Sequence, residues 1–204
     1  VELIREDPNH AGYKSTVIYQ AEWHKGVIGI VASRLIDKFF YRPTIVLTKS
    51  NGTVSGSARS VKDFDVYNAI ESCSGLLEQF GGHMYAAGLT MKPENVEAFK
   101  EKFEEVVAST IESHMLEREI EIDVEVNLAD ITPNFFNILK QFAPFGPGNM
   151  SPIFKSSGVK DNGKCRVVGN NHLKLSVKQN DSKTSFDSIA FQMGEHFSRI
   201  EKGN

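Results

Sequence analysis

The sequence predicts two domains: an α/β (α+β) domain with a mixed sheet over residues 1–113, followed by a small β-barrel domain over residues 118–204. In the first part, stretches with helical periodicity alternate with short apolar strands. In the second, short strands are separated by turns rich in Asn, Asp and Gly, a spacing typical of small barrels. These two patterns, and the change between them near Arg118, are the observations that predict the fold class.

Charge is distributed unevenly along the 204 residues. Residues 93–125 contain eleven acidic and three basic side chains, a net charge of −8, which leaves +5 on the rest of a chain whose total is −3. We interpret the acidic part as a solvated helix face and a connector. The mildly basic remainder permits binding to a phosphate backbone.

The first domain is predicted from its strands, helices and turn signals. The pattern indicates strands at residues 15–20, 44–47, 53–59 and 86–91. It indicates a helix at residues 27–40, a second helix capped by Asp65 and a third that begins at Pro93. The second helix would include Leu76 and Leu77 unless Gly75 breaks it. Asn51-Gly52 is a hairpin signal. A strand-helix-strand start favours a parallel pair and the hairpin an antiparallel one, so we expect a mixed sheet.

The second domain is predicted to begin with a half-buried strand, because apolar residues alternate with charges from Ile120 to Val126. Thr132 and Pro133 then begin a helix. Four strands are expected at residues 153–156, 164–168, 172–178 and 185–191, with turns that include Asn180-Asp181-Ser182. Alternation along 172–178 places Lys174, Ser176 and Lys178 on one face, with Leu173, Leu175 and Val177 toward the core.

Two stretches of the first domain favour a phosphate site. Gly81-Gly82-His83 is predicted to form a loop whose bare backbone approaches an anion, with His83 as a proton donor. The stretch from Ser55 to Ser60 carries one arginine, which can fork onto phosphate. The candidate binding residues are Ser57, Arg59, Ser60, Gly81, Gly82 and His83. Alternatively, the first stretch is a simple turn and the second an edge strand with a solvated arginine.

No catalytic residue and no metal ligand set is expected within these 204 residues. The six histidines are isolated from one another, whereas a two-metal hydrolase needs clustered Asp and His ligands. Cys73 and Cys165 lack a Cys-x-x-Cys spacing, which fits a reducing compartment. With no membrane-spanning run and no signal peptide, we expect a cytoplasmic protein. Because the chain starts at Val1, we also expect it to be part of a larger protein.

Four motifs in order carry a family resemblance. They are residues 23–34, Gly56-Ser57-Ala58-Arg59-Ser60, Gly81-Gly82-His83 with Ala86-Ala87-Gly88, and Pro144-Phe145-Gly146-Pro147-Gly148-Asn149. The series resembles the carboxy-terminal half of the RecJ family of single-strand-specific 5′-to-3′ DNA exonucleases, which belong to the DHH superfamily. The family's proline after Gly-Asn is absent here, because Met150-Ser151 precedes Pro152.

The resemblance implies a DHH-associated domain followed by an OB-fold domain. It implies that the six phosphate-site candidates hold a substrate phosphate against a manganese or magnesium centre supplied by a preceding domain. The parent protein would then hydrolyse phosphodiester bonds in DNA repair and recombination with metal-activated water, and this part alone would be inactive. A single-strand-binding protein or a helicase would be its partner, with no membrane involved.

The predicted barrel contributes a separate signal for single-stranded DNA. Basic residues are spread over its strands and turns; the candidates for DNA contact are Lys164, Arg166, Lys174 and Lys178, with Lys160 and Lys183 nearby. At most one of Phe154, Phe186 and Phe191 is expected to stack on a base. The alternatives are a smaller DHH phosphoesterase acting on short oligonucleotides or cyclic dinucleotides, and a non-catalytic nucleic-acid-binding module.

Overall fold

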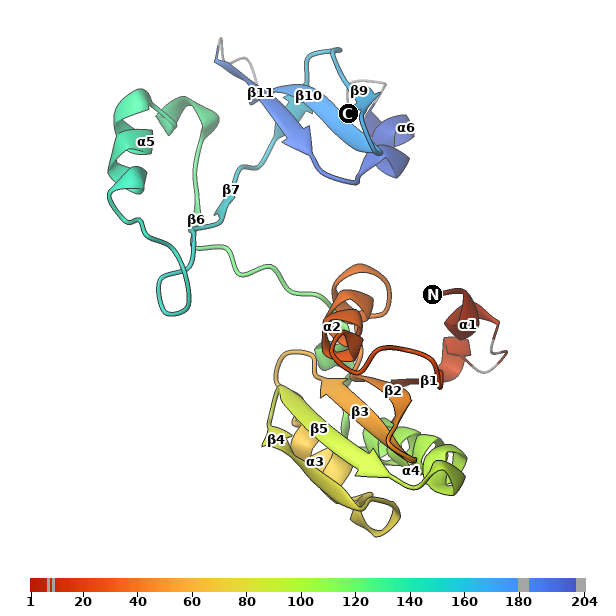
Figure 1. Cartoon of the computed structure of the whole chain (residues 1–204). Helices are drawn as coiled ribbons and strands as arrows, with labels where there is room; N and C mark the ends of the chain where they lie inside the picture. The colour runs from red at the N-terminus through yellow and green to blue at the C-terminus, as the bar shows by residue number, and fades with distance from the viewer. Residues whose placement is uncertain (7, 9, 180–183, 201–204) are drawn as a thin grey trace. The chain divides into compact units, whose positions relative to one another are not determined.

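The computed structural model describes residues 1–6, 8, 10–179 and 184–200. The predicted turn at Asn180-Asp181-Ser182 and the basic residue Lys183 lie outside the described residues. The chain divides into two compact units, Val1–Glu119 and Ile120–Asn204, each of which is described by itself (Figure 1).

The first unit is built on a five-stranded sheet. Its strands are β1 (Thr16–Tyr19), β2 (Thr44–Ser50), β3 (Thr53–Arg59), β4 (Gln79–His83) and β5 (Ala86–Met91), in the order β1-β2-β3-β5-β4. The β1–β2 pair is parallel, and the β2–β3, β3–β5 and β5–β4 pairs are antiparallel. The predicted mixed sheet is confirmed.

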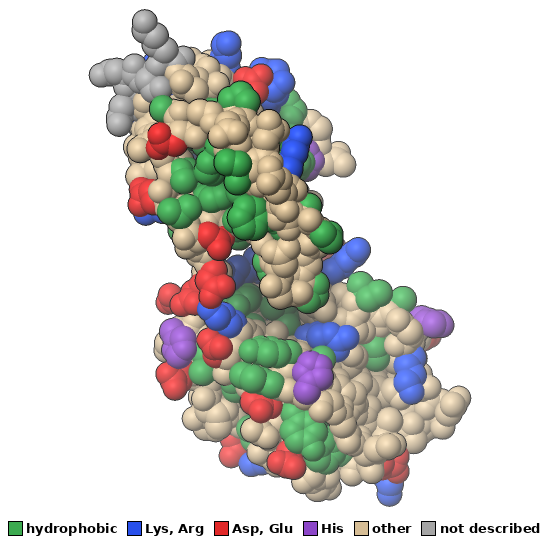
Figure 2. Space-filling model, turned by 90° about the vertical axis from the view of Figure 1, so that its left-hand side faces the viewer, with side chains coloured by type: hydrophobic (Ala, Val, Ile, Leu, Met, Phe, Trp, Pro, Cys, Tyr) green, Lys and Arg blue, Asp and Glu red, His purple; other side chains and the backbone are tan. Residues whose placement is uncertain are grey.

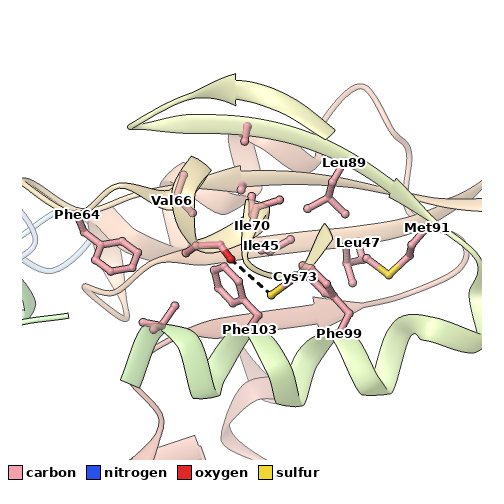
Figure 3. Packing of buried hydrophobic residues seen from close by; sticks show 14 of the residues in the cluster. Ile45, Leu47, Phe64, Val66, Ile70, Cys73, Leu89, Met91, Phe99 and Phe103 are labelled. Carbon is pink, nitrogen blue, oxygen red and sulfur yellow. Dashed lines mark hydrogen bonds between the residues drawn. The ribbon is translucent and has the colours of Figure 1, made fainter. Parts of the chain in front are cut away.

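Helices cover both faces of this sheet. The helices are α1 (Glu2–Arg5), α2 (Ile28–Lys38), α3 (Val66–Glu71) and α4 (Val96–Thr110). Val46 points to the face on which α2 packs with Ile28, Ala32 and Leu35. Its neighbours Ile45 and Leu47 point to the opposite face, where they join α3 and α4 in the larger core (Figure 3). Strand alternation thus divides one buried strand between two cores.

The larger core encloses Cys73. Its thiol donates to the carbonyl oxygen of Ala69 at 3.5 Å, drawn as the dashed line in Figure 3. Burial raises the pKa of this thiol to about 11. Because the thiolate is the reactive form, Cys73 is a packing residue.

Two local signals produce the structures that they predict. Asn51 and Gly52 have φ values of 51° and 83°, the positive pair that a tight hairpin between twisted strands requires. The Asp65 carboxylate accepts a hydrogen bond from the Asn68 N–H at 3.0 Å and so begins α3. This helix ends at Glu71, and Leu76 lies in a separate 3-10 turn containing Gly75.

The Gly-Gly-His stretch differs from the prediction. It is not a loop: Gly81, Gly82 and His83 are the last three residues of strand β4 and pair with Gly88, Ala87 and Ala86 of β5. The hairpin turn is Met84-Tyr85. Small residues on both strands allow the two backbones to pair, which a glycine-based turn signal does not reveal.

The second unit contains two sheets. Strands β6 (Val124–Glu125) and β7 (Phe154–Lys155) pair in parallel, while β10 (His172–Gln179) pairs antiparallel with β8 (Val159–Asp161), β9 (Arg166–Val168) and β11 (Ser185–Ala190). Helix α5 (Pro133–Lys140) begins at Thr132, whose hydroxyl accepts from the Phe135 N–H, and a short α6 spans Phe197–Ile200. Figure 2 views the side that carries α5, where hydrophobic side chains gather. The exposed ones include Phe136, Ile138 and Phe142.

The structure of this unit differs from the sequence-based prediction at three points. The alternating stretch from Ile120 to Val126 is not a half-buried strand, because only Val124–Glu125 pairs with a neighbour and Ile120 is 71% exposed. Strand β8 was not predicted. Ser176 shares the strand face of Lys174 and Lys178, as alternation predicts, but it is buried rather than open: its N–H donates to Asp161 and its hydroxyl accepts from the Asn162 side chain.

Candidate functional site

Cross-strand register brings the predicted phosphate residues together on one face of the first sheet. Arg59 of β3 lies opposite Ala86 of β5, which lies opposite His83 of β4. One pleat further along, Ser57, Gly88 and Gly81 form a second such row. Directly opposed residues point to the same side, so all six share one face. We call Ser57, Arg59, Gly81, His83, Ala86 and Gly88 the open face.

The open face is a patch of sheet with almost no side chains at its centre. Gly81, His83 and Gly88 are exposed and Ala86 is half-buried. A Cβ added at Gly81 would meet no atom within 4 Å. Helix α2 packs over β2 and β3 and leaves β5 and β4 uncovered on this side (Figure 1). A flat ligand can therefore lie directly against the backbone.

Arg59 is held with part of its guanidinium unused. Its Nη1 donates to the Ser57 hydroxyl oxygen at 2.9 Å and to the Ala58 carbonyl oxygen at 2.7 Å. The Ser57 oxygen accepts, so its own proton remains available to a second acceptor. No hydrogen bond of Nη2 occurs among the described residues. Arginine and serine together thus offer donors to an anion on the open face.

Helix α2 adds a feature that the sequence reasoning did not assign to the site. Gly29 lies in its first turn, and a Cβ there would come within 2.7 Å of Arg59 Nη2 and 3.0 Å of Ser57 Oγ. The helix begins at Val27 without a side-chain cap, so its first N–H groups lack internal acceptors. These donors carry the positive end of the helix dipole. The glycine was visible in the sequence, but its contact partner was not.

His83 borders the open face at the edge strand. Its Nδ1 accepts a hydrogen bond from the Tyr85 N–H at 3.3 Å. A neutral ring in this state carries its proton on Nε2, which leaves that N–H as a donor. His83 and Arg59 are two strand spacings apart, about 10 Å between backbones. A ligand between them is within reach of both side chains.

Two predicted residues are not brought to the open face. Gly82 points to the opposite side, where a Cβ would lie 2.3 Å from the Ala86 carbonyl oxygen, and its φ is 154°. Ser60 donates its hydroxyl proton to the Phe64 carbonyl oxygen at 2.7 Å and its N–H to the Tyr85 carbonyl oxygen at 3.0 Å. Both residues shape the hairpin that carries His83.

In the second unit, register gathers basic side chains across β10. Lys174 lies opposite Arg166 of β9, and Lys178 lies opposite Lys160 of β8. We call these four residues the basic face. Like charges directly opposite one another destabilise a sheet. Lys164, the remaining basic candidate, is exposed in the β8–β9 connection. An anionic ligand would relieve this repulsion.

Phe191 is the most accessible of the three candidate aromatics. It is 68% exposed, and its ring centroid lies 5.3 Å from that of His172, which begins β10. Phe154 and Phe186 are half-buried, and Phe154 packs edge-on against Phe135. An exposed ring beside the basic face is suited to stack on a base.

Asp161 organises the turn below the basic face. Burial alone would raise its pKa, but backbone N–H groups of Ser176, Cys165, Gly163 and Lys164 donate to the carboxylate and hold its pKa below the usual value. The bonds from Ser176, Cys165 and Gly163 measure 2.9, 3.0 and 2.7 Å. Asp161 therefore stays ionised as a structural acceptor.

Side chains that commonly bind metals do not cluster in the described part of the chain. Across that part, no three His, Cys, Asp or Glu side chains gather in a group that could hold an ion. Within the same part of the chain, none of the helices has the length and apolar character needed to cross a membrane.

Comparisons with known proteins match the two units of the chain separately. A model of the DHHA1 domain matches residues 12–109, and a model of the RecJ OB domain matches residues 122–204. The single-stranded-DNA-specific exonuclease RecJ of Bacillus subtilis is 34% identical over 88% of this chain, and that of Escherichia coli is 32% identical over 86%. The chain spans only 23% and 31% of those relatives' lengths.

A solved structure extends the similarity to three dimensions. RecJ from Thermus thermophilus, in complex with Mn²⁺, superposes with a TM-score of 0.75 and 28% identity over 95% of this chain and 27% of its own. The same protein has also been solved with Mg²⁺. The predicted OB-type second domain is thereby confirmed. On these matches the chain belongs to the RecJ family, of which it carries the DHHA1 and OB domains.

Proposed function

We propose that this chain is the substrate-binding part of a 5′-to-3′ exonuclease that acts on single-stranded DNA. In this proposal residues 1–113 hold the nucleotide to be cleaved and residues 118–204 extend the binding track along the strand. The observation that carries the proposal is the open face, where Arg59, Ser57 and His83 surround a patch that carries only the Ala86 methyl group between glycines.

The open face would bind one phosphate of the strand. The Arg59 guanidinium and the Ser57 hydroxyl donate from one side, His83 Nε2–H from the other, and the first turn of α2 adds its dipole. Gly81 and Gly88 leave room for the sugar to lie against the sheet. Gly82 and Ser60 would act indirectly by holding the hairpin in place.

The basic face would bind further phosphates without reading sequence. Lys174, Lys178 and Arg166, with Lys164 beside them, supply charge, and Phe191 supplies a stacking surface. Phosphate contacts of this kind give salt-dependent affinity for any strand.

Hydrolysis would require groups from elsewhere in the parent protein. Manganese or magnesium would be bound by a domain outside these 204 residues and would supply the activated water. We therefore expect the 204-residue chain to release no mononucleotides from 5′-labelled single-stranded DNA with Mn²⁺ present; metal-dependent release would contradict this. A single-strand-binding protein or a helicase would act with the parent protein in the cytoplasm.

A double-mutant cycle tests the open face. Arg59→Ala and His83→Ala should each weaken binding of a nucleoside 5′-monophosphate to the 204-residue chain. Because both contact one anion, the double variant should be non-additive, with a coupling of about 0.5–3 kcal/mol. Calorimetry measures affinity and thermal melting measures folding.

Matched controls separate the site from general effects. Arg34→Ala removes an exposed arginine of α2, and His114→Ala removes an exposed histidine paired with Glu112; neither residue belongs to the open face. Neither should change affinity. Strictly additive losses in the cycle, or losses that follow melting temperature, would remove Arg59 and His83 from a shared phosphate site.

A further inference from the structure

The free edge of the first sheet carries a cavity that the nucleic-acid site does not use. Strand β1 is the outermost strand, opposite the edge formed by β4. A cavity of about 640 Å³ lies along it, lined by the whole of β1, by Ile4 and Tyr13, and by one side of α4. Edge strands present backbone donors and acceptors that another chain can pair with.

Register shows which backbone groups are unpaired. The N–H groups of Thr16 and Gln20 donate to Pro43 and Leu47, so the even-numbered residues of this stretch face β2. The odd-numbered residues face outward. The outward N–H of Ser15 is already met by the Glu104 carboxylate at 2.9 Å. For the N–H groups of Val17 and Tyr19, no acceptor is found in the described part of the chain.

The two walls of the cavity differ in chemistry. One wall is the solvent side of α4, with Glu97, Glu101, Glu104 and Glu105 at helical spacing. Glu97 is paired with Lys100 and Glu105 with Lys102, while Glu101 has no ion pair among the described residues. The other wall is Ile4 and Tyr13, beside the buried Arg42. Arg42 donates to Thr16 Oγ1, to the His10 and Tyr13 carbonyls, and contacts His10 Nδ1.

We propose that β1 accepts an extended segment of a basic partner protein as a sixth strand of this sheet. Its backbone would pair with the outward groups of Val17 and Tyr19. Alternate side chains would point to the two walls, lysines or arginines toward α4 and apolar residues toward Ile4 and Tyr13. On the α4 wall Glu101 has no ion pair among the described residues, and Glu104 accepts only from the Lys14 and Ser15 N–H groups and the Ser15 hydroxyl. These two carboxylates keep the wall negative and so select a basic segment.

The test uses synthetic peptides on the 204-residue chain. A labelled Lys-Val-Lys-Val-Lys-Val peptide should bind in fluorescence anisotropy, and a Glu-Val-Glu-Val-Glu-Val peptide should not. Glu101→Lys should weaken the lysine peptide by about tenfold or more, as expected for reversing a charge at a docking surface. Glu94→Lys makes the same charge change at an exposed position outside the cavity and should have no effect.

Hydrogen exchange locates the bound strand. The amides of Val17 and Tyr19 should gain protection when the lysine peptide binds, while those of Gly81 and His83 in the opposite edge strand should not. The proposal is wrong if the lysine peptide fails to bind, if it binds without protecting Val17 and Tyr19, or if Glu94→Lys weakens it as much as Glu101→Lys. Binding of the glutamate peptide with equal affinity would also overturn it.

Discussion

Replacing Gly82 with alanine should unfold the first unit at a markedly lower temperature, whereas the same change at Gly81 should not. A Cβ at Gly82 would lie 2.3 Å from the Ala86 carbonyl oxygen and 2.5 Å from Ala87 Cα, both backbone atoms of the paired strand. Its φ of 154° is one that side chains rarely adopt. At Gly81 the added carbon meets nothing within 4 Å.

The magnitude follows from these contacts. Overpacking costs about 1–3 kcal/mol, and a strained backbone angle adds about 1–3 kcal/mol, so Gly82→Ala should cost about 2–6 kcal/mol. At about 4 °C per kcal/mol for a unit of this size, melting should fall by about 8 °C or more. Gly81→Ala should change stability by less than about 1 kcal/mol.

The assay is thermal unfolding of both variants followed by circular dichroism. Equal melting temperatures for Gly81→Ala and Gly82→Ala would refute the reasoning, because only Gly82 combines close backbone contacts at its missing Cβ with a positive φ. A Gly82→Ala variant that melts like the original chain would do the same. Mononucleotide binding measured below the melting transition then separates a hairpin role for Gly82 from a direct one.

Two further predictions concern the second unit. The double variant Lys174→Gln, Lys178→Gln should weaken single-strand binding and reduce the slope of log affinity against log salt concentration by about 0.7 per lost phosphate contact. The control Lys155→Gln, which removes the partner of Glu125 outside the basic face, should leave this slope unchanged. An unchanged slope in the double variant would place the DNA elsewhere. Asp161→Asn should destabilise the unit by about 1–3 kcal/mol at neutral pH. Because the folded pKa of Asp161 is lowered, its stabilisation is present above the unfolded value of about 3.9 and is lost as pH falls through the folded value. The difference in urea unfolding between the two proteins should therefore be full at pH 7 and shrink as pH falls below about 3.9; a difference that stays constant through this acid range would contradict a charged acceptor.

The sequence by itself determined the features that rest on local chemistry. Asn51-Gly52 specified a tight hairpin because its two residues accept positive φ, and Asp65 began α3 because its carboxylate reaches an N–H three residues on. Burial on α4 followed helical periodicity at Val96, Phe99, Phe103 and Val107. The four motifs likewise indicated the family, because each is a short continuous run of residues and their order is fixed along the chain.

Only the tertiary structure decided what depends on strand register. Gly-Gly-His was predicted to be a loop because glycine pairs are common in turns, yet these residues pair with Gly88 and Ala87 across a turn at Met84-Tyr85, two residues that carry no glycine or proline turn signal. The same register separated Gly81 from Gly82, which point to opposite faces and so have different roles. The burial of Ser176 was not predicted, because alternation gives the face of a residue but not its contact with a distant side chain such as that of Asp161.

The same distinction between local chemistry and strand register applies to the residues of the candidate site. Arg59, Ser57 and His83 could be chosen from residue chemistry, since each offers donors to an anion. That Gly29 lies against Arg59, and that Lys174 faces Arg166, required distant segments to be placed side by side. Donors and acceptors are properties of single residues, which sequence shows directly, whereas a binding surface is set by which strands become neighbours, and that is settled by long-range packing.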